Sequence, residues 1–159
     1  MTKPMILVHF DHFKETFPFR ALEWLLAVFM IGWGLILLHP DYDVTLSNTW
    51  ASLFVHVSPK LFGSACLAVG LIRFAALLIN GMWWRTPFAR LVTTFAANLL
   101  WVCIVFGLAA SDTLNTGWAI YPACVVAELY NAFRSADDSR KSWAARKAAR
   151  LGRLSLIHI

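Results

Sequence analysis

The sequence predicts an all-α integral membrane protein with four transmembrane helices in a bundle and short interfacial helices. Of the 159 residues, 59% are hydrophobic and 14% are charged. Soluble domains instead contain about 45–50% apolar and about 25% charged residues. The segment 61–79 is as long as a bilayer core requires and contains a single charged residue, Arg73. The chain length suits four such spans and leaves no room for a separate soluble domain.

The first segment, residues 1–20, is too short and too charged to span a membrane, and we expect an interfacial helix there. Its apolar residues recur at helical spacing: Ile6, Phe10, Phe13 and Phe17. Pro18 is expected to separate this helix from the first span. A signal peptide is the alternative, but the long apolar run begins only after Pro18 and no convincing cleavage site follows it.

The transmembrane domain is expected at residues 21–133, with spans at about 21–39, 60–80, 88–110 and 117–133. The last span is short and contains Pro122 and Glu128. Between the first two spans we expect a short helix on the membrane surface, with Ser47 as its N-terminal cap. An i, i+3, i+4, i+7 stripe predicts that helix: Trp50, Leu53, Phe54 and Val57.

The distribution of basic residues predicts the orientation. With four spans, Lys60 is alone on one side, and the remaining Lys and Arg residues outside the membrane core lie on the other. By the positive-inside rule, both termini and the link at 80–87 face the cytoplasm. We therefore expect a protein of the bacterial inner membrane.

Residues 134–153 form a basic cytoplasmic tail that is rich in alanine and is expected to be helical. Its cations suit anionic lipid headgroups: Arg140, Lys141, Arg146, Lys147, Arg150 and Arg153. Nucleic acid is the rival ligand, but no base-reading module accompanies the tail. Residues 154–159, LSLIHI, translate CTGTCTCTTATACACATCT, a transposon end used in sequencing libraries, and we interpret them as an assembly artefact; a genuine apolar tail is the alternative.

Polar residues inside the spans are the candidate functional site. Arg73 and Glu128 are expected at a similar depth, and a buried charge in a membrane needs a partner. We therefore predict a buried ion pair between them, with Glu23 or Asn131 supplying further hydrogen bonds. The cluster either fixes how the spans pack or belongs to a proton or ion path. We favour packing, because a relay needs more than one such station.

The sequence predicts no catalytic, cofactor-binding or metal site, and we expect the protein not to be an enzyme. Nucleophile motifs, phosphate-binding loops and paired-cysteine signatures are missing from the sequence. The three cysteines lie in apolar runs and are expected to pack rather than react: Cys66, Cys103 and Cys124. A metal site at His39 and His56, near Asp41 and Asp43, is the weaker alternative.

Two segments, LIRFAALLINGMWWRTPFAR (71–90) and YPACVVAELYNAFRSADDSR (121–140), resemble uncharacterised small multi-span membrane proteins of bacteriophages and prophages. This resemblance implies a phage-related role in a host membrane and no particular site residues. We expect a non-catalytic interaction or accessory component that contacts the lipid bilayer. The alternatives are a holin-like pore-former, which would form homo-oligomers through a face such as that of Gly63 and Gly70, and a small transporter or channel subunit with Arg73, Glu128 and Asn98 along its path.

Overall fold

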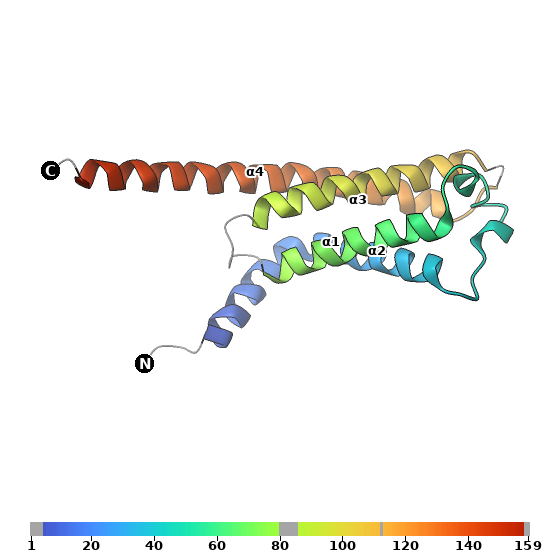
Figure 1. Ribbon diagram of the computed structural model, residues 1–159, viewed down its shortest axis with the longest axis horizontal. Helices are drawn as coiled ribbons and strands as arrows, with labels where there is room; N and C mark the ends of the chain where they lie inside the picture. The colour runs from blue at the N-terminus through green and yellow to red at the C-terminus, as the bar shows by residue number, and fades with distance from the viewer. Residues whose placement is uncertain (1–4, 80–85, 112, 158–159) are drawn as a thin grey trace.

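The computed structural model describes residues 5–79, 86–111 and 113–157, and it is helical throughout these ranges apart from its loops (Figure 1). Its helices are α1 (Met5–Leu38), α2 (Pro59–Leu78), α3 (Thr86–Ala109) and α4 (Gly117–Ile157). Two short 3₁₀ helices, η1 (Val44–Leu46) and η2 (Leu53–Val55), lie between α1 and α2. The described residues contain no strand, which confirms the all-α prediction.

Three segments are long and apolar enough to cross a membrane: Arg20–Leu38, Pro59–Leu78 and Phe88–Ala109. Their outward faces carry large apolar side chains, such as Leu35 and Ile72, each 56% exposed, and Phe106, 70% exposed. Continuous apolar surface of this kind is suited to contact with a lipid bilayer. α4 does not meet the same criterion over the described residues, and its role as a fourth span stays a prediction.

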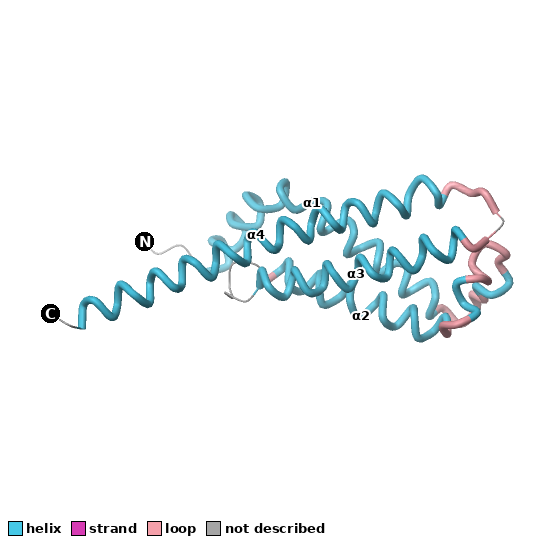
Figure 2. The backbone as a smooth tube through the Cα atoms, turned by 90° about the horizontal axis from the view of Figure 1, so that it is seen from above, coloured by secondary structure: helices cyan, strands magenta, loops and turns pink. Residues whose placement is uncertain are grey.

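The helices form an antiparallel bundle in which consecutive helices pack side by side. The main interfaces join α1 to α2, α2 to α3 and α3 to α4, while α1 and α4 close the bundle through a much smaller interface. The beginning of α1 and the end of α4 lie at one end of the bundle (Figure 1). Figure 2 shows the loops between α1 and α2 and between α3 and α4 together at the other end, called the loop end below.

Glycines permit the close contact between α1 and α2. A Cβ atom added at Gly34 would lie 2.6 Å from the Leu67 backbone nitrogen and 2.8 Å from the Gly63 carbonyl oxygen. A Cβ atom at Gly70 would lie 2.9 Å from the Ile31 backbone nitrogen. Small residues let helix backbones approach in this way. The face of Gly63 and Gly70, which the sequence offers for oligomer formation, is therefore covered by α1 of the same chain.

The segment between α1 and α2 differs from its prediction. It contains η1 and η2 with turns between them, not one surface α-helix, and Ser47 caps no helix. The apolar stripe, Trp50, Leu53, Phe54 and Val57, packs against the core of the bundle. Ser52 Oγ donates a hydrogen bond to the Gly107 carbonyl at 2.8 Å, and Gly107 leaves space for the Leu53 side chain. The segment thus closes the loop end, because Gly107 of α3 accepts the hydrogen bond from Ser52 and has no side chain where Leu53 packs.

One predicted helix boundary, at Pro18, is wrong. α1 is continuous through Pro18, although its first turns point away from the bundle axis (Figure 1). Pro18 removes one backbone donor, which bends a helix more often than it ends one when the flanking residues favour helix. α4 continues without a break through the basic tail, which was expected to be helical because of its alanine content. Whether residues 5–20 lie in the interface stays a prediction.

We predict that Gly34→Ala destabilises the protein by about 1–3 kcal/mol, because the added methyl group meets the backbone of α2. Gly32 is the matched control on the same helix, since a Cβ atom there meets nothing within 4 Å. Gly32→Ala should leave stability unchanged or raise it by up to about 1 kcal/mol. Thermal unfolding of both variants in detergent checks this. Equal midpoints for Gly34→Ala and the wild type would contradict the close α1–α2 contact.

Candidate functional site

The first buried ion pair joins α2 to α4. Arg73 Nη1 donates a hydrogen bond to Glu128 Oε1, and the two side chains are 1% and 0% exposed. These residues are 55 positions apart in the sequence. The structure brings together the pair that was predicted from the similar depth of the two residues in their spans. The contact sets the relative height of α2 and α4, because neither charge can be buried without the other.

Several polar atoms around this pair have no hydrogen-bond partner within the described part of the chain. They are Arg73 Nε and Nη2, Glu128 Oε2 and the Asn131 amide nitrogen Nδ2. Asn131 lies one turn beyond Glu128 on the same helix and is 1% exposed. Buried polar groups are almost always hydrogen-bonded to protein or to ordered water. This part of the interior therefore has the donors and acceptors to hold water.

A second and more complete ion cluster joins three helices. Arg90 Nε donates to Glu23 Oε2 at 2.9 Å, and Arg90 Nη2 donates to Glu23 Oε1 at 2.5 Å. Arg90 Nη1 donates to Asp138 Oδ2 at 3.1 Å. Asp138 also lies 3.8 Å from Arg20 Nη2. Since the two-pronged contact with Glu23 matches the planar fork of the guanidinium, Arg90 holds α1, α3 and α4 in one geometry.

This second cluster corrects the sequence-based assignment of Glu23. Glu23 was expected near Arg73 and Glu128, but both of its oxygens accept hydrogen bonds from Arg90. From the sequence, Arg90 is predicted only as one of the charges outside the membrane core, whereas its side chain is 0% exposed. The signal that could have found it is depth: Glu23 and Arg90 each lie two or three residues inside a candidate span, Arg20–Leu38 and Phe88–Ala109, at the end of the bundle opposite the loop end. Asp138 gave no such signal, because it lies in the polar tail.

A neutral contact continues the polar seam between α3 and α4. Asn98 Nδ2 donates to the Val125 carbonyl oxygen at 3.0 Å. Asn98 is 8% exposed, so its amide is directed into the α3–α4 interface and does not face lipid. At the loop end, Thr49 and Thr113 pair through their hydroxyl oxygens at 3.0 Å. Polar side chains thus link α3 to α4 within the bundle and the two loops to each other at the loop end.

The residues considered for metal binding are dispersed. His39 Nδ1 accepts a hydrogen bond from the Asp41 backbone nitrogen at 3.3 Å, and both side chains are exposed. No group of three His, Cys, Asp or Glu residues that could hold a metal ion occurs in the described residues. The three cysteines are free thiols, of which Cys66 and Cys124 are buried and Cys103 is exposed.

No protein-family model, curated protein or solved structure matches the chain.

The charges inside the bundle are held in contact with one another. The arrangement can lock helices in register, because every buried charged side chain in the described ranges belongs to an ion pair: Glu23, Arg73, Arg90 and Glu128. It can also hold water at the atoms of Arg73 and Glu128 that protein groups leave unpaired.

We predict that Arg73→Leu and Glu128→Leu each destabilise the protein by about 3–5 kcal/mol, because each leaves an unpaired charge in the interior. The double variant should recover much of that loss, since it buries two apolar side chains instead. Thermal unfolding in detergent for the four proteins of this cycle measures the coupling. If both single variants were as stable as the wild type, Arg73 and Glu128 would not form a buried pair.

Proposed function

We propose that this chain is a non-catalytic, four-span protein of the bacterial inner membrane that acts as an interaction or accessory component. Its resemblance to phage and prophage membrane proteins favours a phage-encoded origin. The observation that carries the proposal is that the buried charges neutralise each other in fixed contacts. Such contacts fit a role in holding the bundle together, because side chains that bind each other are not free for a substrate.

The first half of α4 is proposed as the fourth span. Its residues 117–133 would extend about 26 Å at 1.5 Å per residue, close to the hydrocarbon thickness of about 30 Å. Glu128, within this span, is paired with Arg73 of α2, so this acid need not face lipid. The end of α4 lies at the same end of the bundle as the start of α1 (Figure 1), as an even number of crossings requires.

The second half of α4 is the proposed interaction element. It leaves the bundle along the helix axis and extends beyond the other helices (Figure 1). Asp138 anchors its base through Arg90. Four cations along it are exposed: Arg140, Lys141, Arg146 and Lys147. Of these, Arg140 and Lys141 are nearest the bundle, so we propose that they meet anionic lipid headgroups.

Salt bridges along this extension are local and exposed. Lys141 Nζ lies 2.6 Å from Asp137 Oδ2, one turn earlier on the helix. The hydrogen bond from Lys141 holds the pKa of Asp137 below its ordinary value, and the same contact raises the pKa of Lys141. Both groups are therefore charged around neutral pH, and the extension remains cationic overall. Nucleic acid is a less favoured ligand, because the cations belong to a segment that adjoins the membrane.

A second candidate is a small transporter or channel subunit. The unpaired atoms of Arg73, Glu128 and Asn131 favour it, because they could bind water within the bundle. In that case Arg73→Leu would abolish flux in a protein that remains folded. A holin-like pore-former is less favoured, because α1 covers the glycine face of α2 that could have joined subunits.

The topology is tested with single cysteines in a parent whose Cys66, Cys103 and Cys124 are replaced by alanine. Leu114→Cys in the α3–α4 link, where Leu114 is 93% exposed, reports on the loop end. Ala145→Cys, at an exposed position, reports on the extension. An impermeant maleimide should label Leu114→Cys in intact spheroplasts and Ala145→Cys only after permeabilisation. Labelling of both from the same side would show that α4 does not cross, and the reverse pattern would refute the orientation.

Induced expression in a bacterial host separates the accessory role from a pore. We predict no change in membrane potential, measured with a voltage-sensitive dye, at expression levels that are visible in the membrane fraction. The paired charges carry this expectation, since Arg73 is bound to Glu128 and Arg90 to Glu23. The empty vector provides the baseline and a known pore-former the positive control. Depolarisation followed by lysis would instead establish the holin-like alternative.

A further inference from the structure

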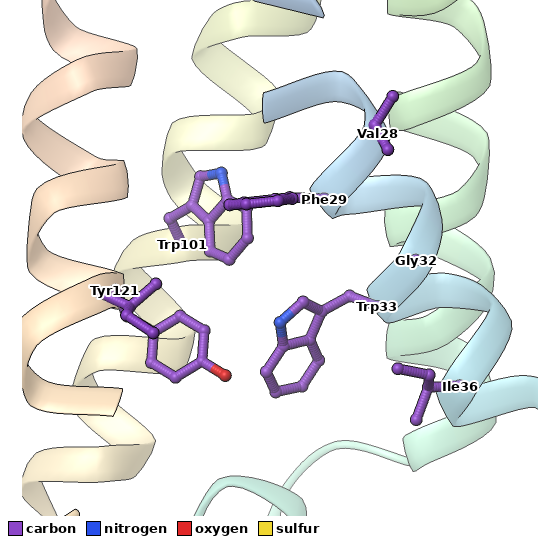
Figure 3. Close-up of a pocket in the computed structure, with 8 residues that line it drawn as sticks. Val28, Phe29, Gly32, Trp33, Ile36, Trp101 and Tyr121 are labelled. Atoms are coloured by element: carbon purple, nitrogen blue, oxygen red, sulfur yellow. The ribbon is translucent and has the colours of Figure 1, made fainter. Parts of the chain in front are cut away.

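A groove of about 370 Å³ lies between α1 and α4 in the half of the bundle nearest the loop end. Figure 3 shows α1 on one side of it, α4 on the other, and Trp101 of α3 behind. The lining is almost entirely apolar and aromatic: Val28, Phe29, Gly32, Trp33, Ile36, Trp101, Ile120 and Tyr121. Its volume falls within the range of about 300–1,000 Å³ of sites for small molecules.

Ion pairs hold the α1–α4 seam at one end only, while at the loop end the contact between the two helices is that of Trp33 with Tyr121. At the opposite end, Arg90 ties Glu23 of α1 to Asp138 of α4. Towards the loop end no ion pair joins these two helices in the described residues, and Gly32 presents no side chain to the gap. The wall faces outward, with Val28 50% and Ile36 55% exposed. Because Arg20–Leu38 is one of the membrane-spanning segments, the medium at this opening is lipid.

A polar pocket of about 240 Å³ continues the groove at the loop end. The two share Ile120 and Tyr121 in their walls. The remaining lining of the polar pocket is Thr49, Trp50, Asn115, Thr116 and Gly117. An apolar groove at membrane depth thus leads into a group of hydroxyl and amide side chains at the membrane surface. This order of apolar and polar parts matches a molecule with a hydrocarbon chain and a polar head.

The floor of the groove contains an unused hydrogen-bond donor. Trp101 is 1% exposed, and its indole Nε1 has no hydrogen-bond partner within the described ranges. Tyr121 stacks on this indole with ring centroids 6.0 Å apart, while Trp33 packs edge-on against Tyr121 at 5.6 Å. A buried indole N–H usually has an acceptor.

We propose that this groove binds one diacyl phospholipid from the leaflet at the loop end. One acyl chain lies between α1 and α4 over Trp101, and the headgroup region lies against Thr49, Asn115 and Thr116. The inference rests on insertion of the bundle into a bilayer, which is part of the proposed function, but not on any interaction of the basic extension. The ligand of the α1–α4 groove would thus be a lipid of the surrounding bilayer.

The test uses the full chain in phosphatidylethanolamine vesicles that contain a trace of phosphatidylethanolamine with a diazirine in one acyl chain. After irradiation, peptide mapping should find the label on the groove side of α1 and at the start of α4. Gly32→Phe fills the groove and should reduce that label about tenfold, since Gly32 faces open space. Leu71→Phe is the matched control, because Leu71 is a 50% exposed position on α2 and should leave the groove label unchanged.

Ile120→Trp provides a second block where the groove meets the polar pocket, should Gly32→Phe prove unstable. Native mass spectrometry of the wild type should also retain one phospholipid that both blocking variants lose. Equal labelling of wild type and variants would mean annular lipid only and would overturn the proposal. A dimer in native mass spectrometry that both blocking variants abolish would overturn it in favour of a second copy of the chain. Maleimide labelling of Leu114→Cys and Ala145→Cys measures insertion into the membrane independently. Failure of the bundle to cross the membrane is therefore distinguishable from an empty groove.

Discussion

A charged side chain inside a bilayer must find an opposite charge, and this requirement organises the whole bundle. Arg73 meets Glu128 between α2 and α4, and Arg90 meets Glu23 and Asp138 between α3, α1 and α4. Each pair fixes the relative height of two helices, because a shift of one turn would leave two charges unpaired in an apolar interior. Apolar packing between lipid-facing helices supplies no comparable specification of register, since lipid tails are as apolar as leucine side chains.

The two ion clusters also make the bundle asymmetric along its length. Arg90 draws α1, α3 and α4 together at the end where both chain termini emerge, and Asp138 starts the projecting part of α4 there. At the other end, Ser52 and Leu53 of the segment between α1 and α2 contact Gly107 of α3 and so close the bundle. A groove lined by Trp101 lies between α1 and α4 in the same half. One end is therefore suited to hold the projecting part of α4 in place, and the other is the end at which we propose that lipid binds.

Sequence reasoning succeeded where a feature depends on local composition or on depth. It predicted spans at about 60–80 and 88–110, and the structure has α2 at Pro59–Leu78 and α3 at Thr86–Ala109. It also placed Arg73 opposite Glu128 by counting residues from the span ends. It missed Arg90, because an arginine close to a span end is ordinarily an orientation signal, and nothing local distinguishes a buried one. The prediction of a surface helix at residues 40–58 was wrong for a similar reason, since an amphipathic stripe does not reveal whether its apolar side chains face lipid or protein.

The sequence by itself determined that this is a helical membrane protein with interior charges, because hydropathy and the cost of burying a charge are properties of the residues alone. Only the tertiary structure decided which acid pairs with which arginine, that α1 covers the glycines of α2, and that a groove lies between α1 and α4 in the half of the bundle nearest the loop end. These outcomes depend on the rotation of each helix about its axis. That rotation is set jointly by close backbone contacts and ion pairs between residues far apart in the chain.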